Sequence, residues 1–194
     1  MRFEKGHKET TRRRIVEVAS RRFRRDGGSA SGLAGIMAEA GLTNGAFYPH
    51  FDSKEALFRE ALVAALAGQQ ARLDEAGDAA AGIAGAIRHY LNLSHREGSE
   101  DGCPSAALLP EIGRETEPTR QAYEDGLRAY TSALAERLPD AGTPAAVQRA
   151  TSIFALMVGT MQIARAVPST ARAREILEGG IDAALRLAEV PQRS

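Results

Sequence analysis

Residues 43–54, TNGAFYPHFDSK, bring together side chains whose types suit contact with DNA. An asparagine can read adenine through paired donor and acceptor groups, and a glycine and an alanine beside it permit close approach to base edges. A tyrosine, a histidine and a lysine follow, and these suit phosphates, which position a protein without reading sequence. The predicted DNA contacts are Thr43, Asn44, Gly45, Ala46, Tyr48, His50 and Lys54.

These side chains need an element that presents them, and residues 32–51 have the pattern of a helix-turn-helix. Gly41 supplies a residue that tolerates positive φ in the turn. Thr43 is predicted to cap the second helix, whose N-terminus carries partial positive charge and free N–H groups. The inner face of the first helix consists of Leu33, Ile36 and Met37. The aromatic residues Phe47, Phe51 and Phe58 are predicted to form a small core behind the contact surface.

The net charge is zero, with 25 basic and 25 acidic residues, but the charges are unevenly placed. Residues 1–25 hold ten arginines and lysines against three glutamates, a balance that favours a polyanionic partner. Two alternatives stay open, because a basic helix can also lie on a membrane or form a solvated face. Arg13, Glu17 and Arg21 have the spacing of local ion pairs.

Composition and punctuation predict an all-α fold. Isoleucine and valine together make only 16 of 194 residues, which disfavours sheets. Glycines and prolines separate about nine helical segments, and no strand is predicted. The predicted segments are 10–26, 32–40, 43–49, one that opens at Ser53, 83–98, 104–113, 123–138, 144–167 and a last one that carries Ile176, Leu177, Ile181, Ala184 and Leu185.

The same composition excludes several classes of protein and site. One cysteine rules out an internal disulfide framework and a cysteine-based zinc cage. His89 and His95 are six residues apart and cannot share a helix face, so we expect no metal and no cofactor. No apolar run approaches the ~18 residues of a membrane span, so we expect a soluble, cytoplasmic protein. No nucleophile elbow, phosphate loop or metal triad indicates an enzyme.

The motif IMAEAGLTNGAFYPHFDSKEALF at 36–58, after a basic first helix, strongly resembles the DNA-binding domain of the tetracycline-repressor (TetR) family of bacterial regulators. The resemblance is detailed over residues 10–60 and extends to the rest of the chain as architecture. It implies DNA contacts at the matching positions, which are Thr43, Asn44, Gly45, Tyr48, His50 and Lys54. Two positions depart from the family pattern: Gly32 stands where many relatives have a capping serine or threonine, and Asn44 replaces a frequent lysine.

The resemblance implies a homodimeric, ligand-responsive repressor that binds a palindromic double-stranded DNA operator and is released by a small-molecule effector. The DNA-binding domain is predicted over 1–52, and the effector-binding and dimerisation domain over 53–194. The candidate effector-pocket residues are Tyr90, Cys103, Tyr123, Met157 and Met161. The last two helices are expected to form a four-helix dimer interface. Its candidate residues are Val147, Phe154, Val158, Ile176, Ile181 and Leu185. A non-specific architectural DNA-binding protein is the competing hypothesis.

Cys103 lies in the segment DGCPSAALLPEI, after a polar turn and at a predicted helix N-terminus. The helix dipole there favours a thiolate. The GCP segment resembles one found in a subset of the family, some of whose relatives use a cysteine as a sensor. Cys103 could therefore sense an electrophilic or oxidising effector, or it could be a small buried residue that packs at the helix start.

Overall fold

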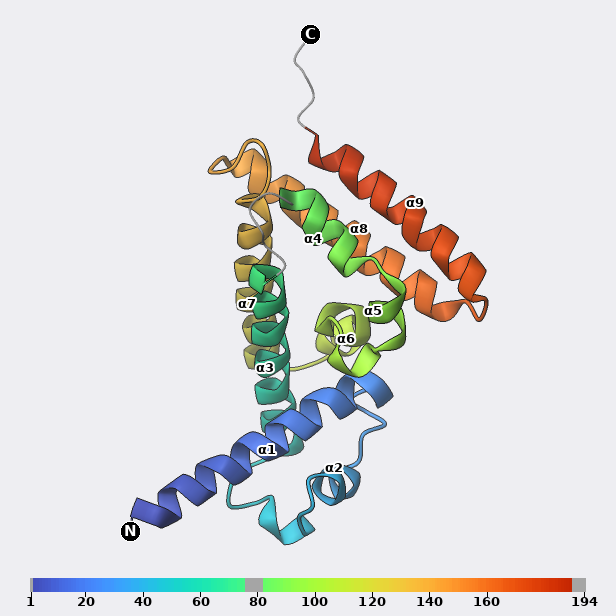
Figure 1. The fold of residues 1–194 in the computed structure, drawn as a ribbon. Coiled ribbons are helices and arrows are strands. Elements are labelled where there is room, and N and C mark those ends of the chain that lie inside the picture. Colours follow the sequence, from blue (N-terminus) through green and yellow to red (C-terminus); the bar gives the residue numbers. More distant parts are fainter. Residues whose placement is uncertain (1, 76–81, 190–194) are drawn as a thin grey trace.

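The structure, a computed structural model, describes residues 2–75 and 82–189 (Figure 1). Within these ranges it holds nine α-helices, two 3₁₀ turns and no strand, which confirms the all-α fold class. The elements are α1 (Arg2–Asp26), α2 (Leu33–Glu39), η1 (Asn44–Ala46), α3 (Lys54–Glu75), α4 (Gly82–Tyr90), α5 (Leu93–Glu97), η2 (Ser99–Asp101), α6 (Pro104–Ile112), α7 (Glu117–Ala135), α8 (Pro144–Ala166) and α9 (Thr170–Ala188).

The N-terminal helices enclose a first hydrophobic cluster, built around aromatic side chains. Phe47, Phe51 and Phe58 are at most 4% exposed, which confirms the prediction that they form a core. Apolar residues of α1 and α2 fill the space between them. The other large members are Ile15, Phe23, Ile36, Met37, Leu57 and Leu62, with Leu108 and Ile112 of α6 closing one side.

Helix α1 begins at Arg2, earlier than the predicted start at Thr10 or Thr11. The Thr10 hydroxyl donates to the Gly6 carbonyl at 2.9 Å, so this side chain bonds within the helix and does not cap it. The side chains of Arg2 and Lys5, which belong to the basic segment, lie outside the described part. At its other end α1 stops at Gly27, whose φ of +87° suits a glycine.

The turn of the helix-turn-helix forms at Gly41, as predicted, with φ +69°. A Cβ at this position would also meet the Arg14 guanidinium at 2.9 Å. Gly32 is the N-cap residue of α2 and provides no side-chain cap, and the preceding Ser31 hydroxyl donates to the Gly27 carbonyl at 2.7 Å. The N-cap position of α2, which holds a serine or threonine in many relatives, therefore offers no side-chain hydroxyl to the first turn of the helix.

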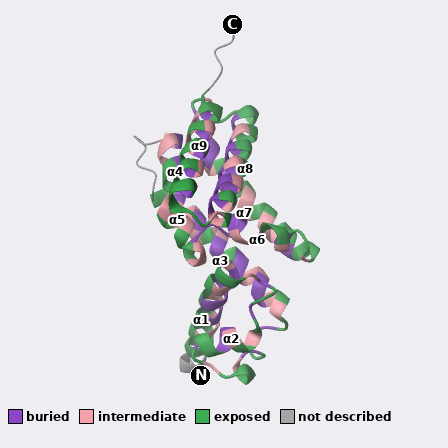
Figure 2. Ribbon diagram, turned by 90° about the vertical axis from the view of Figure 1, so that its right-hand side faces the viewer, coloured by how far each residue is buried: buried purple, intermediate pink, exposed green. Residues whose placement is uncertain are grey.

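The remaining helices form a second cluster, in which α8 and α9 lie side by side and α7 packs against both α3 and α8 (Figures 1 and 2). Helix α3 runs through both clusters without a break: its Leu57 belongs to the first and its Leu73 to the second. A predicted domain boundary at residue 53 thus falls at the start of a helix that the two clusters share, and it stays a prediction.

The predicted helix over 83–98 is two helices. The chain leaves α4 after Tyr90, and Asn92 restarts it by accepting a hydrogen bond from the His95 backbone N–H at 2.8 Å. The Asn92 amide also donates to the His89 carbonyl at 2.6 Å, which gives a backbone carbonyl at the end of α4 a hydrogen-bond partner. One asparagine side chain therefore closes one helix and opens the next.

Candidate functional site

The segment 43–50 forms an exposed tip on the N-terminal module. Thr43, Asn44 and Gly45 are exposed, and Tyr48 is 70% exposed. The predicted second helix is only one 3₁₀ turn, η1, followed by further turns. Thr43 stands at its N-cap position but makes no side-chain capping bond, so that part of the prediction is wrong and its hydroxyl is left outward.

Aromatic contacts fix this tip on the module. The Tyr48 ring meets Phe47 edge-on with centroids 5.5 Å apart, and Phe47 stacks on Phe51 at 5.4 Å. The Arg12 guanidinium lies over the Phe51 ring, 4.5 Å from its centroid, and pairs with Glu60 of α3. Tyr48 is therefore held at its base while its outer part stays in solvent.

A shallow groove of about 670 Å³ separates the tip from the N-terminal half of α1. His7, Lys8 and Thr11 line it on one side, and Ala46 and His50 on the other. The half-buried His50 ring has an Nδ1 without a hydrogen-bond partner. Burial lowers the pKa of His50, and the nearby Lys8 and Arg12 charges lower it further. This environment favours an anion. The negative charge of a phosphate would raise the pKa of His50 and so oppose the effects of burial, Lys8 and Arg12.

Much of the positive charge of α1 is used inside the protein. Arg22 and Arg25 both bond the Glu39 carboxylate, at 3.0 and 3.2 Å. Arg24 donates to the Glu100 carbonyl of η2 at 2.7 Å and to the Ser20 hydroxyl at 2.7 Å. Arg25 is nevertheless exposed, and the other exposed cations of this helix, among the described side chains, are Lys8, Arg13, Arg14 and Arg21. Some cations of the basic segment are thus bonded to other residues of the protein, and others are exposed to solvent.

Lys54 is placed differently from the other predicted contacts. Its ammonium donates to the Gly28 carbonyl at 2.7 Å, in the turn that follows α1. The Gly28 N–H in turn donates to the Glu111 carboxylate of α6 at 2.7 Å. Lys54 therefore joins α3 to the end of α1, and its contact with a phosphate stays a prediction.

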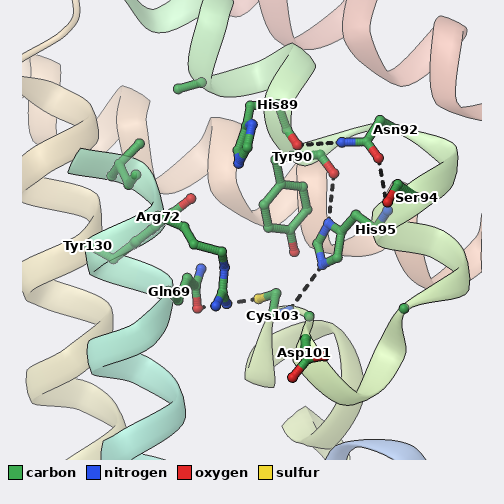
Figure 3. A pocket seen from close by; sticks show the side chains of 14 residues that line it. Gln69, Arg72, His89, Tyr90, Asn92, Ser94, His95, Asp101, Cys103 and Tyr130 are labelled. Carbon is green, nitrogen blue, oxygen red and sulfur yellow. Dashed lines mark hydrogen bonds between the residues drawn. The ribbon is translucent and has the colours of Figure 1, made fainter. Parts of the chain in front are cut away.

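The main cavity of the C-terminal region has a volume of about 340 Å³ and lies between α3, α4, α5, η2 and α7 (Figure 3). Tyr90 and Cys103, two of the predicted pocket residues, line it. Tyr123 does not: its hydroxyl bonds Ser105 at 3.0 Å, and its ring packs on the first cluster. The other two predicted residues, Met157 and Met161, are fully buried in the second cluster.

The cavity also contains residues that the sequence did not single out as ligands. Gln69 and Arg72 of α3 line its wall. A signal for Gln69 exists, because it continues the buried stripe of Ala65 and Leu73 at helical spacing and is only 5% exposed. A polar side chain on an apolar stripe indicates a site.

Cys103 is joined to this wall by three hydrogen bonds in series. Its thiol donates to the Gln69 side-chain oxygen at 3.5 Å, and its backbone N–H donates to His95 Nε2 at 3.0 Å. His95 Nδ1 lies 2.7 Å from the Tyr90 carbonyl, so the neutral ring with its proton on Nδ1 satisfies both partners. The thiol is 1% exposed and at the N-cap of α6, and its role as a sensor stays a prediction.

The wall formed by α5 is anchored to the end of α8 by two arginines. Arg96 donates to the Ala164 and Val167 carbonyls at 2.8 and 2.7 Å. Arg165 donates to the His95 carbonyl at 2.7 Å. Burial lowers the pKa of His95 to about 4, despite its bond to the Tyr90 carbonyl, and the cation on Arg165 contributes. His95 is therefore a neutral, fixed part of the cavity at physiological pH.

The outer faces of α8 and α9 carry exposed apolar and small side chains among charged and polar ones. On α8, Val147 is 42% and Ile163 57% exposed, and on α9 Leu187 is 43% exposed. Three predicted interface residues, Ile176, Ile181 and Leu185, are half-buried. The prediction is wrong for two others: Phe154 and Val158 belong to the core of the chain itself. Phe154 packs on Tyr130 with centroids 4.8 Å apart, which leaves it no surface to offer a partner.

Two family patterns match this chain. Residues 15–61 match the family described as bacterial regulatory proteins, tetR family, and residues 78–178 match the LmrA/YxaF-like transcriptional regulator C-terminal domain. The chain belongs to the TetR family. This TetR-family protein is therefore a DNA-binding transcriptional regulator, not an enzyme, and the helix-turn-helix tip described above lies in the DNA-binding part of the family.

Relatives and solved structures agree with this assignment. The chain is 28% identical over 138 residues to the regulator LmrA of Bacillus subtilis, across 68% of this TetR-family chain and 73% of that protein. It is 43% identical to AcrR of Shigella flexneri over 56 residues, 29% of this chain and only 26% of that protein. The fold matches the reduced form of E. coli NemR with a TM-score of 0.76 and 22% identity, over 95% of this chain and 100% of that one. A TetR-family regulator of Cytophaga hutchinsonii also has a TM-score of 0.76, with 20% identity over 96% and 98% of the two chains.

Two further findings bear on the sequence predictions for this TetR-family protein. In the described part, no helix has the length and apolar character that crossing a membrane requires. Over the same residues, no three histidine, cysteine, aspartate or glutamate side chains come together in a group that could hold a metal ion.

Proposed function

We propose that this protein is a ligand-responsive repressor that acts in the cytoplasm as a homodimer on a palindromic operator. Each protomer would place its 43–50 tip in one of two successive major grooves. Binding of a small molecule in the 340 Å³ cavity would favour a dimer whose tips are wrongly spaced for DNA. The observation that carries the proposal is that one chain has both an exposed polar tip and a separate cavity. Elements at the cavity are hydrogen-bonded to the end of α1, in the N-terminal module that carries the tip.

Two contacts support communication between the cavity and the tip. Turn η2 lines the cavity through Asp101, and its Glu100 carbonyl accepts from Arg24 of α1. Helix α6 starts at the cavity with Cys103, and its Glu111 carboxylate accepts from the Gly28 N–H after α1. A displacement of η2 or α6 would therefore act directly on the C-terminal end of α1, which packs against α2 and α3.

The dimer is supported by the composition of the outer face of α8 and α9. The exposed or half-buried positions between Val147 and Ile163 on α8 include Ala155 and Gly159. On α9 the positions near Leu187 include Gly179 and Ala183. Small residues between larger apolar ones permit two helix pairs to approach closely, as a four-helix interface requires.

Tyr48 supplies the test of DNA recognition. Binding sites are first selected from random duplex DNA, and we expect a palindromic sequence. Replacing Tyr48→Ala should weaken operator binding at least about tenfold, because a phosphate contact is lost. Thermal stability should change little, since the side chain is 70% exposed.

Matched controls separate this effect from a general loss of charge or fold. Tyr48→Phe keeps the ring and removes only the hydroxyl, and Arg128→Ala removes an exposed charge on α7. Lys54→Ala is a poorer test, because it also releases the Gly28 carbonyl. Unchanged operator affinity in Tyr48→Ala, or equal affinity for scrambled DNA, would contradict the proposal and favour a non-specific DNA-binding protein.

A further inference from the structure

Three arginine side chains lie in or close behind the wall of the 340 Å³ cavity. Arg72 lines its wall, and none of the ion pairs among the described residues includes it. The Arg165 guanidinium lies behind the Gly102 wall, where a Cβ would meet it at 2.8 Å. Arg24 adds a third positive charge: burial and then Arg72 lower its pKa to about 10, so it stays charged. The carboxylate that lines the cavity is Asp101, which is exposed.

Two deeply buried polar groups on the cavity wall lack hydrogen-bond partners. The Gln69 amide nitrogen and the Tyr90 hydroxyl are both unbonded, in side chains only 5% and 6% exposed. Each can donate a hydrogen bond, and leaving such a group unpaired costs free energy. Burial, with Cys103 adding to it, raises the pKa of Tyr90, so its hydroxyl keeps its proton and remains a donor.

Another part of the wall is aromatic and apolar, and exposed residues border the way in. The Tyr90 and Tyr130 side chains line the cavity together with Leu73 and Ala86. His89, Ser94 and Gly98 are exposed lining residues, which places the mouth near α4 and α5 (Figure 3). A volume of about 340 Å³ is at the lower end of the ~300–1,000 Å³ of ligand pockets, so a one-ring molecule fits better than a large one.

We infer that the cavity binds a small aromatic carboxylate. Its carboxylate oxygens accept from the Arg72 guanidinium, the Gln69 amide and the Tyr90 hydroxyl, and its ring lies between the two tyrosines. Charge-assisted hydrogen bonds from arginine suit a carboxylate better than any neutral group. The inference deepens the proposed function, on which it rests, by giving the chemical class of the effector.

Matched pairs of carboxylates and their amides test the inference on the full-length protein. The probes are benzoate, 2-hydroxybenzoate, 4-hydroxybenzoate, phenylacetate and cinnamate, each beside its primary amide, which has a similar shape and no charge. Affinity is measured by titration calorimetry without DNA. We expect at least one carboxylate to bind about tenfold or more tightly than its amide, as the loss of charged hydrogen bonds predicts.

Three variants locate the binding. Arg72→Gln should weaken the carboxylate about tenfold or more and leave the amide unchanged. Tyr90→Phe should weaken it severalfold, and this variant should fold well because it removes an unpaired hydroxyl. The matched control is Arg88→Gln, which removes an exposed charge of α4 and should change nothing. Equal affinity of carboxylates and amides, no binding of any carboxylate, or equal loss in Arg72→Gln and Arg88→Gln would overturn the inference.

Operator binding is measured on the same preparations, so the two proposals fail separately. If the wild type binds a palindromic operator and no carboxylate binds, only the ligand class is wrong. If a carboxylate binds through Arg72 and the protein shows no operator preference, the proposed function is wrong and the cavity assignment stands.

Discussion

A single histidine makes the stability of the cavity wall depend on pH. The pKa of His95 is lowered to about 4, first by burial and then by the charges of Arg165 and Arg72, whereas an unfolded chain has a value near 6.5. Between these values the unfolded state binds more protons than the folded state. The stabilisation is therefore complete above about pH 6.5 and is lost as the pH falls toward 4, by about 3 kcal/mol in total.

Chemical denaturation of a His95 variant should show how much of the pH dependence of stability comes from this residue. His95→Gln should be less stable than the wild type at pH 7, because it loses the bond from Cys103 N–H, and its free energy of unfolding should fall less steeply between pH 6.5 and 4. His89→Gln, an exposed histidine of the same cavity, controls for the titration of carboxylates elsewhere. Parallel pH profiles for the two variants would contradict the assignment.

Residue-level predictions from the sequence succeeded where a residue's type decides its place. The aromatic core of Phe47, Phe51 and Phe58 follows from local chemistry, and so does the capping bond that the Ala56 N–H donates to the Ser53 hydroxyl at 3.0 Å. Side chains that long-range contacts place, such as Lys54 on the Gly28 carbonyl, could not be found this way. The Gly28 partner of Lys54 is 26 residues away in the sequence, and a local residue pattern cannot predict such a contact.

At the scale of the elements, the turn at Gly41 decides how η1 is presented. A side chain there would be strained at φ +69° and would displace Arg14. Gly41→Ala should therefore lower the free energy of unfolding by about 1–2 kcal/mol, measured by denaturant titration. Gly45→Ala is a matched change in the same motif, with a permitted φ and nothing within 4 Å of the added Cβ.

The two glycine variants should separate stability from recognition. Gly45→Ala should unfold like the wild type, within about 0.5 kcal/mol, and yet bind the operator more weakly, because its methyl group occupies space next to the DNA. If Gly41→Ala were as stable as the wild type, the turn geometry described for residue 41 would be wrong.

The sequence predicted element types well and element boundaries less well, for physical reasons. Seven of the nine predicted helices each correspond to one α-helix in the described part, whereas the predicted 43–49 helix is a 3₁₀ turn and the 83–98 helix is two helices. In the first case Pro49 and the core packing of Phe47 and Phe51 limit the helix. In the second, Asn92 caps a new helix within an apolar pattern that continues past it.

At the scale of the whole molecule, the proposed dimer depends on the outer face of α8 and α9. Ile163 is 57% exposed there, so Ile163→Asp should not disturb the fold of one chain but should place a charge in the interface. We expect a monomer by sedimentation and a large loss of operator affinity. Val63→Asp, a comparable change at a 49% exposed residue of α3, should remain dimeric. A dimeric Ile163→Asp protein would show that the chains pair elsewhere.

Communication between cavity and operator should depend on one contact between the two clusters. The Arg24 guanidinium holds the Glu100 backbone carbonyl of η2 at 2.7 Å, so movement of η2 on ligand binding reaches α1 through it. Arg24→Met keeps the aliphatic stem and removes the donor. It should bind the operator, and it should bind the carboxylate more weakly because one positive charge near the cavity is lost, but saturating ligand should reduce operator affinity much less than the ~5–150-fold typical of coupled sites. Glu100→Gln keeps the carbonyl that Arg24 bonds and weakens the ion pair of the Glu100 carboxylate with Arg25 at 3.4 Å, so it tests that second contact between η2 and α1 separately. Full coupling in Arg24→Met would leave two routes, the ion pair of Arg25 with the Glu100 carboxylate and the bond from the Gly28 N–H to Glu111 of α6.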